Sequence, residues 1–199
     1  MLTEDRIDGW ENVAMAFAAA RSDIGSDVAR QWAKGLPPGG DLLDLGCGSG
    51  VPIASTLVAE GLTVFGIDAS PTLVSLFRQR LGGARAVCET VQDSAFFGRT
   101  FDGVVAVGLM FLLPEDEQGK LISKVGNALK PGGRFLFSAP RQPCEWKDMQ
   151  TGQHSLSLGE NAYRRLLAGA GMRLMTTYMD EGDNHYFDAA RWSDQAERD

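Results

Sequence analysis

The segment LLDLGCGSGVPIA, residues 42–54, constrains the fold of this chain more than any other feature. A short apolar run carries Asp44, then Gly46, Gly48 and Gly50 follow at alternate positions, and an apolar pattern with helical spacing resumes. Glycine loses backbone entropy in any ordered element, so three glycines this close together indicate a conformation or a close approach that a Cβ atom would block. The segment therefore predicts a buried strand, a turn that a ligand can approach, and a helix.

Strands and helices alternate from this segment to the end of the sequence. Apolar runs typical of strands cover residues 41–45, 63–68, 84–89, 101–109, 134–139, 172–179 and 185–191. Segments with helical spacing cover residues 51–60, 70–81, 114–130 and 157–171, and 92–98 is typical of a short turn or helix. This alternation predicts a mostly parallel α/β sheet. The DEGDN connection before the last strand is too short for a crossover helix, which predicts antiparallel pairing there.

Local signals place the ends of several helices. Ser70 followed by Pro71 is a helix start signal, and Ser157 with Glu160 matches a capping box. Residues 1–40 do not share the alternation and predict two amphipathic helices, in which Arg21 is the residue placed to reach a carboxylate. We therefore expect one domain over 1–199, with a helical cap (1–40) ahead of an α/β core (41–191).

Composition narrows the classes of partner and location. The net charge is −7 and the isoelectric point about 4.9, which disfavours nucleic acid as a partner. Three cysteines lie far apart without a C-x-x-C pair, so neither a disulfide framework nor a zinc site is expected. No apolar run approaches the roughly 20 residues of a membrane span, and the acidic N-terminus lacks the pattern of a signal peptide. We expect a cytoplasmic protein without metal or membrane contact.

Two common nucleotide-binding patterns fail at the glycine-rich turn. The dinucleotide pattern G-x-G-x-x-G would require glycine where Val51 or Ile53 stands, and no phosphate-binding G-x-x-x-x-G-K-[ST] loop occurs. What remains is D-x-G-x-G-x-G, followed by Asp68 at the end of the second strand, 22 residues after Gly46 (68 − 46 = 22). An acid at that place accepts hydrogen bonds from ribose hydroxyls. The combination predicts a nucleoside ligand without a pyrophosphate.

These segments together resemble the class I S-adenosylmethionine-dependent methyltransferases. In order, the resemblance is carried by LLDLGCGSG, VFGIDAS, VQDSAFF, FDGVVAVGLMFLLP and ALKPGGRFLFSAP, and it extends over residues 41 to about 190. It implies a Rossmann-like, doubly wound sheet of seven strands with an antiparallel last strand. It also implies S-adenosylmethionine as cofactor and methyl transfer by in-line displacement, for which positioning and exclusion of water supply much of the rate.

The resemblance assigns cofactor-binding roles to individual positions. It places Asp44, Gly46, Cys47 and Gly48 around the methionine part of the cofactor. It places Asp68, Ala69, Asp93 and Ser94 at the ribose and the adenine, and Gly108 under the sulfonium. Each acid also has a simpler interpretation, with Asp44 capping the turn, Asp68 as a strand-end acid and Asp93 as a helix N-cap. Cys47 has no evident activating base, which favours a small loop residue over a nucleophile.

The acceptor site is expected where a long connection, residues 140–155, meets the DEGDN turn. A connection of this length with little regular pattern is typical of a mobile lid that closes over ligands. On it lie Trp146, Asp148 and the candidate base His154; across from it lie Asp180, Glu181, Asp183 and His185. The acidic turn favours an electropositive acceptor. In the alternative interpretation these are solvated loop charges, Trp146 plugs a hydrophobic gap and His185 is a buried strand residue.

One absence narrows the acceptor further. Methyltransferases that act on the exocyclic amino groups of bases carry [DNS]-P-P-[YFW] after the fourth strand, whereas this chain has VGLM at residues 107–110. The sequence therefore predicts a small-molecule acceptor with a nitrogen or oxygen nucleophile. Two alternatives remain: a non-catalytic S-adenosylmethionine-binding partner subunit, and an NAD-dependent oxidoreductase, which the failed dinucleotide pattern disfavours.

Overall fold

The computed structural model describes residues 2–149 and 151–193. Two helices, α1 (Leu2–Ala20) and α2 (Ser26–Ala33), precede the sheet. The elements that follow are β1 (Asp41–Leu45), α3 (Ile53–Ala59), β2 (Thr63–Asp68), α4 (Pro71–Arg80), β3 (Arg85–Cys88), η1 (Phe96–Gly98), β4 (Phe101–Ala106), η2 (Met110–Leu112), α5 (Glu115–Ala128), β5 (Leu129–Ser138), β6 (Cys144–Lys147), β7 (His154–Ser157), α6 (Glu160–Gly169), β8 (Met172–Met179) and β9 (His185–Arg191).

The sheet has seven strands in the order β3-β2-β1-β4-β5-β9-β8. Neighbours from β3 to β5 pair in parallel, and β9 runs antiparallel to both β5 and β8. The predicted Rossmann-like sheet with an antiparallel last strand is thus confirmed. The chain order reverses between β1 and β4, and open α/β sheets bind their ligands outside the carboxyl ends of the strands at such a point. The topology therefore places the glycine-rich turn after β1 at the expected ligand edge.

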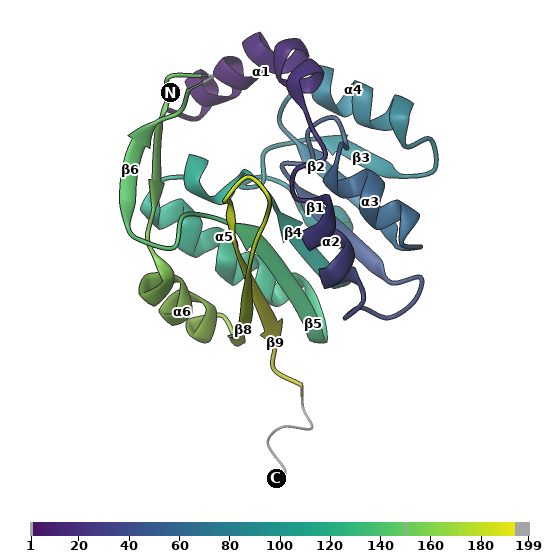
Figure 1. The fold of residues 1–199 in the computed structure, drawn as a ribbon, viewed down its shortest axis with the longest axis vertical. Helices are drawn as coiled ribbons and strands as arrows, with labels where there is room; N and C mark the ends of the chain where they lie inside the picture. Colours follow the sequence, from purple (N-terminus) through teal and green to yellow (C-terminus); the bar gives the residue numbers. More distant parts are fainter. Residues whose placement is uncertain (1, 150, 194–199) are drawn as a thin grey trace.

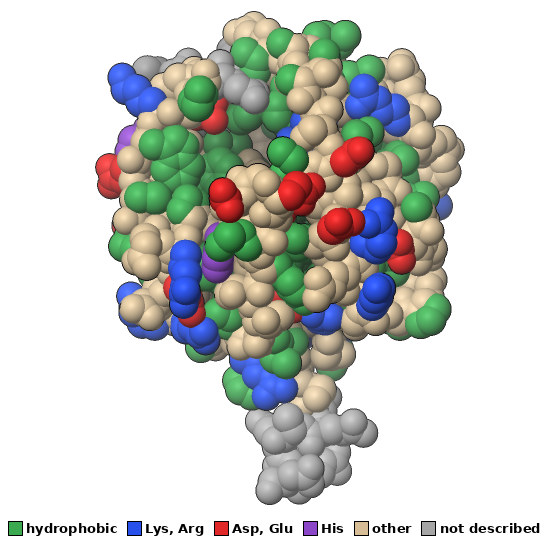
Figure 2. All heavy atoms as spheres, in the orientation of Figure 1, with side chains coloured by type: hydrophobic (Ala, Val, Ile, Leu, Met, Phe, Trp, Pro, Cys, Tyr) green, Lys and Arg blue, Asp and Glu red, His purple; other side chains and the backbone are tan. Residues whose placement is uncertain are grey.

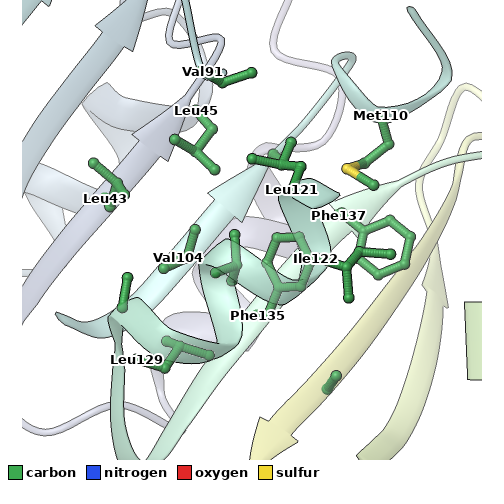
Figure 3. Close-up of a cluster of buried hydrophobic side chains, with 14 of the residues drawn as sticks. Leu43, Leu45, Val91, Val104, Met110, Leu121, Ile122, Leu129, Phe135 and Phe137 are labelled. Carbon is green, nitrogen blue, oxygen red and sulfur yellow. The ribbon is translucent and has the colours of Figure 1, made fainter. Parts of the chain in front are cut away.

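Helices cover both faces of the sheet (Figure 1). Alternate side chains of each strand point to opposite faces, so Leu43 and Leu42 of β1 enter different hydrophobic clusters. The cluster that holds Leu43 is closed by α5 through Leu121 and Ile122, as Figure 3 shows. The cluster that holds Leu42 is closed by α2, α3 and α4. Both faces are buried, which explains why the strands appear as continuous apolar runs.

A buried carboxylate ties the antiparallel end of this sheet to α2. Asp188 of β9 has no exposed surface. It accepts hydrogen bonds from the Trp32 indole Nε1 at 3.0 Å and from the Tyr178 hydroxyl at 3.4 Å, and it forms a salt bridge with Arg134 of β5. One side chain therefore joins α2, β5, β8 and β9. Buried charges are tolerated when they are paired and hydrogen-bonded in this way.

The structure confirms one predicted helix start and corrects another. Ser70 caps α4, since its side chain accepts a hydrogen bond from Leu73 N. The capping box predicted at Ser157 and Glu160 is wrong: Gly159 (φ +79°) precedes the helix, and the Ser157 hydroxyl donates to Pro140 O at 2.6 Å. The sequence pattern was misleading because Ser157 belongs to the preceding strand, β7, so its hydroxyl bonds to the chain outside the helix.

The expectation of little regular structure in residues 140–155 is also wrong. This connection contains the first strand and start of the second strand of an antiparallel hairpin, β6–β7, whose register pairs Trp146 with Ser155 and Lys147 with His154. It lies at the rim of the molecule (Figure 1). A ladder of hydrogen bonds therefore supports this segment. The lid was expected to be mobile because it would have few such bonds, and that reason no longer holds.

Two glycines of α5 should respond in opposite directions to alanine. A Cβ on Gly119 would lie 3.4 Å from Leu166 Cδ2, whereas one on Gly126 would lie 2.4 Å from the backbone oxygen of Ala170. Alanine in a helix interior is worth about 0.8–1.0 kcal/mol over glycine, and overpacking costs about 1–3 kcal/mol. We expect Gly119→Ala to raise the free energy of unfolding in urea and Gly126→Ala to lower it; the same sign for both would contradict this packing.

Candidate functional site

A cavity of about 470 Å³ opens at the carboxyl ends of β1, β2 and β4. Figure 2 shows the face onto which it opens, with a hollow bordered by hydrophobic side chains and acidic side chains gathered beside it. Its lining comes from α1, the glycine-rich turn, the ends of β2, β3 and β4, the β6–β7 connection and the β8–β9 turn. The predicted cofactor residues that line it are Arg21, Asp44, Gly46, Cys47, Gly48, Asp68, Ala69 and Gly108.

The glycine-rich turn presents open backbone to this cavity. Gly46 and Gly48 both have positive φ, +69° and +53°, a region that side chains with a Cβ rarely adopt. The amides of Gly46 and Cys47 both donate to Ile67 O, at 2.8 and 3.0 Å, which fixes the turn against the end of β2. The conformation predicted from the glycine spacing is therefore present, and no Cβ narrows the cavity at Gly46 or Gly48.

Asp68 connects the two turns at this edge. Its Oδ2 accepts from Gly48 N and its Oδ1 from Ser70 N, both at 2.9 Å. Burial raises the pKa of Asp68, and the hydrogen bonds from Ser70 and Gly48 offset this only in part. Each carboxylate oxygen accepts about two hydrogen bonds, so both oxygens keep acceptor capacity for ligand hydroxyls. The geometry suits the ribose role expected of Asp68.

Asp44 is a buried acid next to the glycine-rich turn. It is only 3% exposed, and burial together with the neighbouring Asp68 raises its pKa to about 8, with Arg21 opposing the shift. Arg21 donates from Nε to Val51 O at 3.1 Å and its guanidinium lies 5.0 Å from the Phe17 ring centroid. A carboxyl group in this state is suited to a cationic partner, since such a partner would stabilise its charged form.

The raised pKa of Asp44 predicts a pH dependence of stability. The unfolded chain has the carboxyl ionised above about pH 4, while the folded chain keeps it protonated up to about 8. The folded state therefore binds more protons in this window, and the free energy of unfolding falls as the pH rises from about 4 to about 8. The pKa of Asp68 is also raised, so Asp68 contributes to the same fall in unfolding free energy as the pH rises. We expect Asp44→Asn to gain in melting temperature relative to the original protein between pH 5 and pH 8; a constant difference would contradict the shift.

The structure does not bring Asp93 and Ser94 into the cavity. Glu89, Thr90, Val91 and Gln92 line it instead. Asp93 is exposed, and its Oδ2 accepts from the Thr90 hydroxyl at 2.7 Å. Ser94 is buried, and its hydroxyl accepts from Phe96 N. The turn after β3 therefore presents the residues before Asp93 to a ligand. Asp93 itself contacts Thr90, which lines the cavity.

Of the residues predicted on the connection of the β6–β7 hairpin, Asp148 lines the cavity, whereas Trp146 and His154 do not. Trp146 is absent from the lining but packs on Phe111, which does line it, with ring centroids 5.3 Å apart. His154 is exposed, and its Nε2 lies 3.2 Å from Glu145 Oε2. Asp148 and Gln153, which flank the tip of the hairpin, line the cavity. His154 is therefore not placed to take a proton from a group bound there.

The β8–β9 turn likewise contributes neighbours of the predicted residues. Asp180, Glu181 and His185 do not line the cavity, whereas Asn184 and Tyr186 do. The ring of His185 packs edge-on against Phe187, and its Nδ1 is buried without a hydrogen-bond partner among the described residues. Burial lowers the pKa of His185. The simpler interpretation of His185, a buried strand residue, agrees with this placement.

Asp180 is the centre of a hydrogen-bond network in this turn. Its oxygens accept from the Tyr186 hydroxyl at 2.7 Å, from the Asn184 amide Nδ2 at 3.0 and 3.1 Å, and from the backbone of Gly182 and Asn184 at 2.9 Å. Burial alone would raise the pKa of Asp180, but the bonds from Tyr186 and Asn184 outweigh it and lower that pKa. Burial and the bond to Asp180 raise the pKa of Tyr186. Tyr186 therefore stays protonated and donates to Asp180.

Sequence reasoning missed part of the cavity wall. Five residues that the sequence did not single out line it: Trp10, Phe17, Phe111, Asn184 and Tyr186. Each belongs to an apolar stripe, a strand or a turn, where packing or turn formation alone explains the residue type. Phe17 also packs against the small hydrophobic cluster of Ala14, Ala18 and Leu73. Only the proximity of these segments to the β1 and β4 ends identifies them.

Two further features of the described residues bear on function. No group of three or more histidine, cysteine or acidic side chains among them comes together to hold a metal ion. Within the same residues no helix has both the length and the apolar character needed to cross a membrane.

Comparison with known proteins agrees with this architecture. Residues 42–133 match the family model of the methyltransferase domain. The chain is 35% identical over 112 residues to an uncharacterised methyltransferase of Synechocystis sp., covering 56% of this chain and 52% of that protein. It is 33% identical over 136 residues to the putative methyltransferase YqeM of Bacillus subtilis, covering 63% and 54%. The chain thus spans about half the length of these curated relatives.

Solved structures share the fold. The CcbJ methyltransferase of Streptomyces caelestis superposes with a TM-score of 0.74 at 16% identity, covering 93% of this chain and 98% of that one. Magnesium protoporphyrin IX methyltransferase of Synechocystis, solved with bound S-adenosylmethionine, superposes with a TM-score of 0.67 at 20% identity, covering 83% and 77%. Residues 42–133 are therefore a methyltransferase domain, and the chain has the fold of S-adenosylmethionine-dependent methyltransferases. The family and the cofactor class predicted from the motifs are confirmed.

Proposed function

We propose that this protein transfers a methyl group from S-adenosylmethionine to a nitrogen or oxygen nucleophile of a small molecule. The observation that carries the proposal is one continuous cavity that extends from the glycine-rich turn and Asp68 to a wall of Phe111, Asn184 and Tyr186. The first part suits the cofactor, and the second leaves room for an acceptor beside it. A binding module without activity needs only the first part.

The cofactor fits the chemistry of the residues present. Bound there, S-adenosylmethionine supplies an electrophilic methyl group on a sulfonium. Asp68 would accept from the ribose hydroxyls, Asp44 would face the cationic amino group, and Arg21 would pair with the carboxylate of the methionine part. Thr90, Val91 and Gln92 would border the adenine. The apolar wall excludes water, and positioning then supplies much of the rate.

The helical cap and the α/β core would act as one unit in this function. Trp10, Phe17 and Arg21 of the cap line the same cavity as Asp44 and Asp68 of the core. The cap is fixed to α4 by hydrogen bonds from Ser70 and Thr72 to Glu11. We therefore include residues 1–40 in the catalytic domain.

Two measurements test the proposal. Calorimetric titration with S-adenosylhomocysteine should show one site per chain, and absence of binding at hundreds of micromolar would overturn it. A screen of a metabolite library with tritiated S-adenosylmethionine should then yield a labelled small molecule. Binding of S-adenosylhomocysteine without any labelled product would favour the alternative, a non-catalytic partner subunit.

A further inference from the structure

The wall of the cavity at the β8–β9 turn offers hydrogen-bond acceptors. Tyr186 and Asn184 both line the cavity. The hydroxyl proton of Tyr186 is donated to Asp180 Oδ2, so the phenolic oxygen has only lone pairs left for a ligand. The Asn184 amide turns Nδ2 toward both oxygens of Asp180, so its carbonyl oxygen points away from that carboxylate. Asp180 thus determines the hydrogen-bonding character of two residues that it places on the wall.

Tyr186 and Asn184 line the same cavity as the end of β4, where the sulfonium is expected. Tyr186 pairs directly with Ser138 across β5 and β9, and the Ser138 hydroxyl accepts from Gly108 N at 2.7 Å. Gly108 and Ser138 both line the cavity. A short chain of contacts therefore runs from Gly108, expected under the sulfonium, through Ser138 to Tyr186. Tyr186 is 2% exposed and Asp180 7%, so water competes little for these bonds.

We propose that the methyl acceptor is a primary or secondary amine, whose N–H groups donate to the oxygens of Tyr186 and Asn184. This inference rests on the proposed function. An ester-forming carboxylate would place lone pairs against lone pairs at this wall and is disfavoured by repulsion. Asp180 is a positioning residue, because it acts only through the two residues that it holds.

The reaction balances without a further reagent. The amine binds as the free base, with its N–H groups held by the wall and its lone pair directed at the methyl carbon. The lone pair forms the new N–C bond while the S–C bond breaks and its electron pair returns to sulfur, which becomes a neutral thioether. The methylated ammonium product loses a proton to water. No side chain is required as a base, in keeping with the position of His154 outside the cavity.

An analogue of the cofactor tests the wall without knowledge of the acceptor. Sinefungin carries an amino group on the carbon that replaces sulfur, so it presents an amine where the methyl group would stand. The measured quantity is the ratio of the dissociation constants of S-adenosylhomocysteine and sinefungin, by calorimetry. We expect the original protein to prefer sinefungin, and Tyr186→Phe to reduce the ratio at least about tenfold, the effect of one hydrogen bond from a charged amine.

Asp180→Asn tests whether Asp180 orients the Tyr186 hydroxyl or only stabilises the β8–β9 turn. Its amide oxygen can still accept from the backbone of Gly182 and Asn184, while its amide nitrogen faces Tyr186 and donates to it. The Tyr186 proton then turns into the cavity, and the preference for sinefungin should fall as much as in Tyr186→Phe although every contact residue remains. Asp183→Asn is the matched control: it removes a charge from the same turn at φ +60°, which asparagine tolerates, and should leave the ratio unchanged.

The outcomes distinguish this inference from the proposed function. If S-adenosylhomocysteine binds all variants but the ratio does not respond to Tyr186→Phe or Asp180→Asn, the amine site is wrong while the cofactor site stands. If S-adenosylhomocysteine does not bind the original protein, the proposed function itself fails. In the tritium screen, a product labelled on nitrogen supports the inference, and a product labelled only on oxygen or carbon overturns it.

Discussion

Asp68→Ala is expected to weaken binding of S-adenosylhomocysteine at least about 100-fold. Two hydrogen bonds from ribose hydroxyls to a carboxylate are worth about 1.5–3 kcal/mol each, and about 1.4 kcal/mol corresponds to a factor of ten in affinity. The variant also loses the acceptors for Gly48 N and Ser70 N, which shape the two turns at this edge of the sheet. Isothermal titration calorimetry measures the effect directly.

Asp93→Ala is the matched control for this prediction. Asp93 was expected from its motif to bind the adenine, but it is exposed and touches the cavity only through the Thr90 hydroxyl. Its removal should therefore cost much less affinity than the removal of Asp68. A thermal melt of each variant without ligand shows whether the fold is retained. Binding of Asp68→Ala within tenfold of the original protein, or a larger loss in Asp93→Ala, would contradict the site described above.

Asp188→Ala is expected to cost about 3–5 kcal/mol of unfolding free energy, the usual effect of removing one partner of a buried ion pair. The variant leaves the Arg134 guanidinium without its carboxylate partner, although the Arg134 side chain is only 19% exposed, and it leaves the Trp32 indole N–H without its acceptor. Four elements lose their common contact at once. Urea unfolding followed by circular dichroism measures the change.

Asp188→Asn provides the control, because it keeps the shape and an acceptor for Trp32 but removes the charge. We expect its cost to lie between those of the original protein and Asp188→Ala. Because this network acts on stability, S-adenosylhomocysteine should bind Asp188→Asn with nearly unchanged affinity at a temperature where it is folded. An unfolding free energy of Asp188→Ala within about 1 kcal/mol of the original would show that the ion pair contributes little net stability.

Local sequence determined the sheet and the cofactor edge. Glycine spacing after β1 fixed the open turn, because only glycine adopts positive φ at little cost. Alternating apolar runs identified the seven strands of the sheet, and their spacing required parallel crossovers. Since carboxyl ends of parallel strands share one edge, the sequence alone placed Asp44 and Asp68 together, and the structure has them there.

The same reasoning failed where a single residue step decides which side chain faces inward. Asp93 and Thr90 lie in one turn, as do Asp180 and Asn184, and sequence offers no period there from which an inward face could be calculated. The β6–β7 hairpin was not predicted for a related reason: its short strands contain few apolar residues and show little alternation of apolar and polar residues.

The acceptor wall was decided by tertiary structure alone. Insertion of β9 between β5 and β8 brings Tyr186 opposite Ser138, and packing of α1 on α4 brings Trp10 and Phe17 over the cavity. These contacts join segments that are far apart in the chain, so no local pattern encodes them. Sequence showed that residue 180 is an acid; only the folded chain shows that its oxygens hold the Tyr186 proton and the Asn184 amide, because a hydrogen bond depends on the distance and direction between groups that folding brings together.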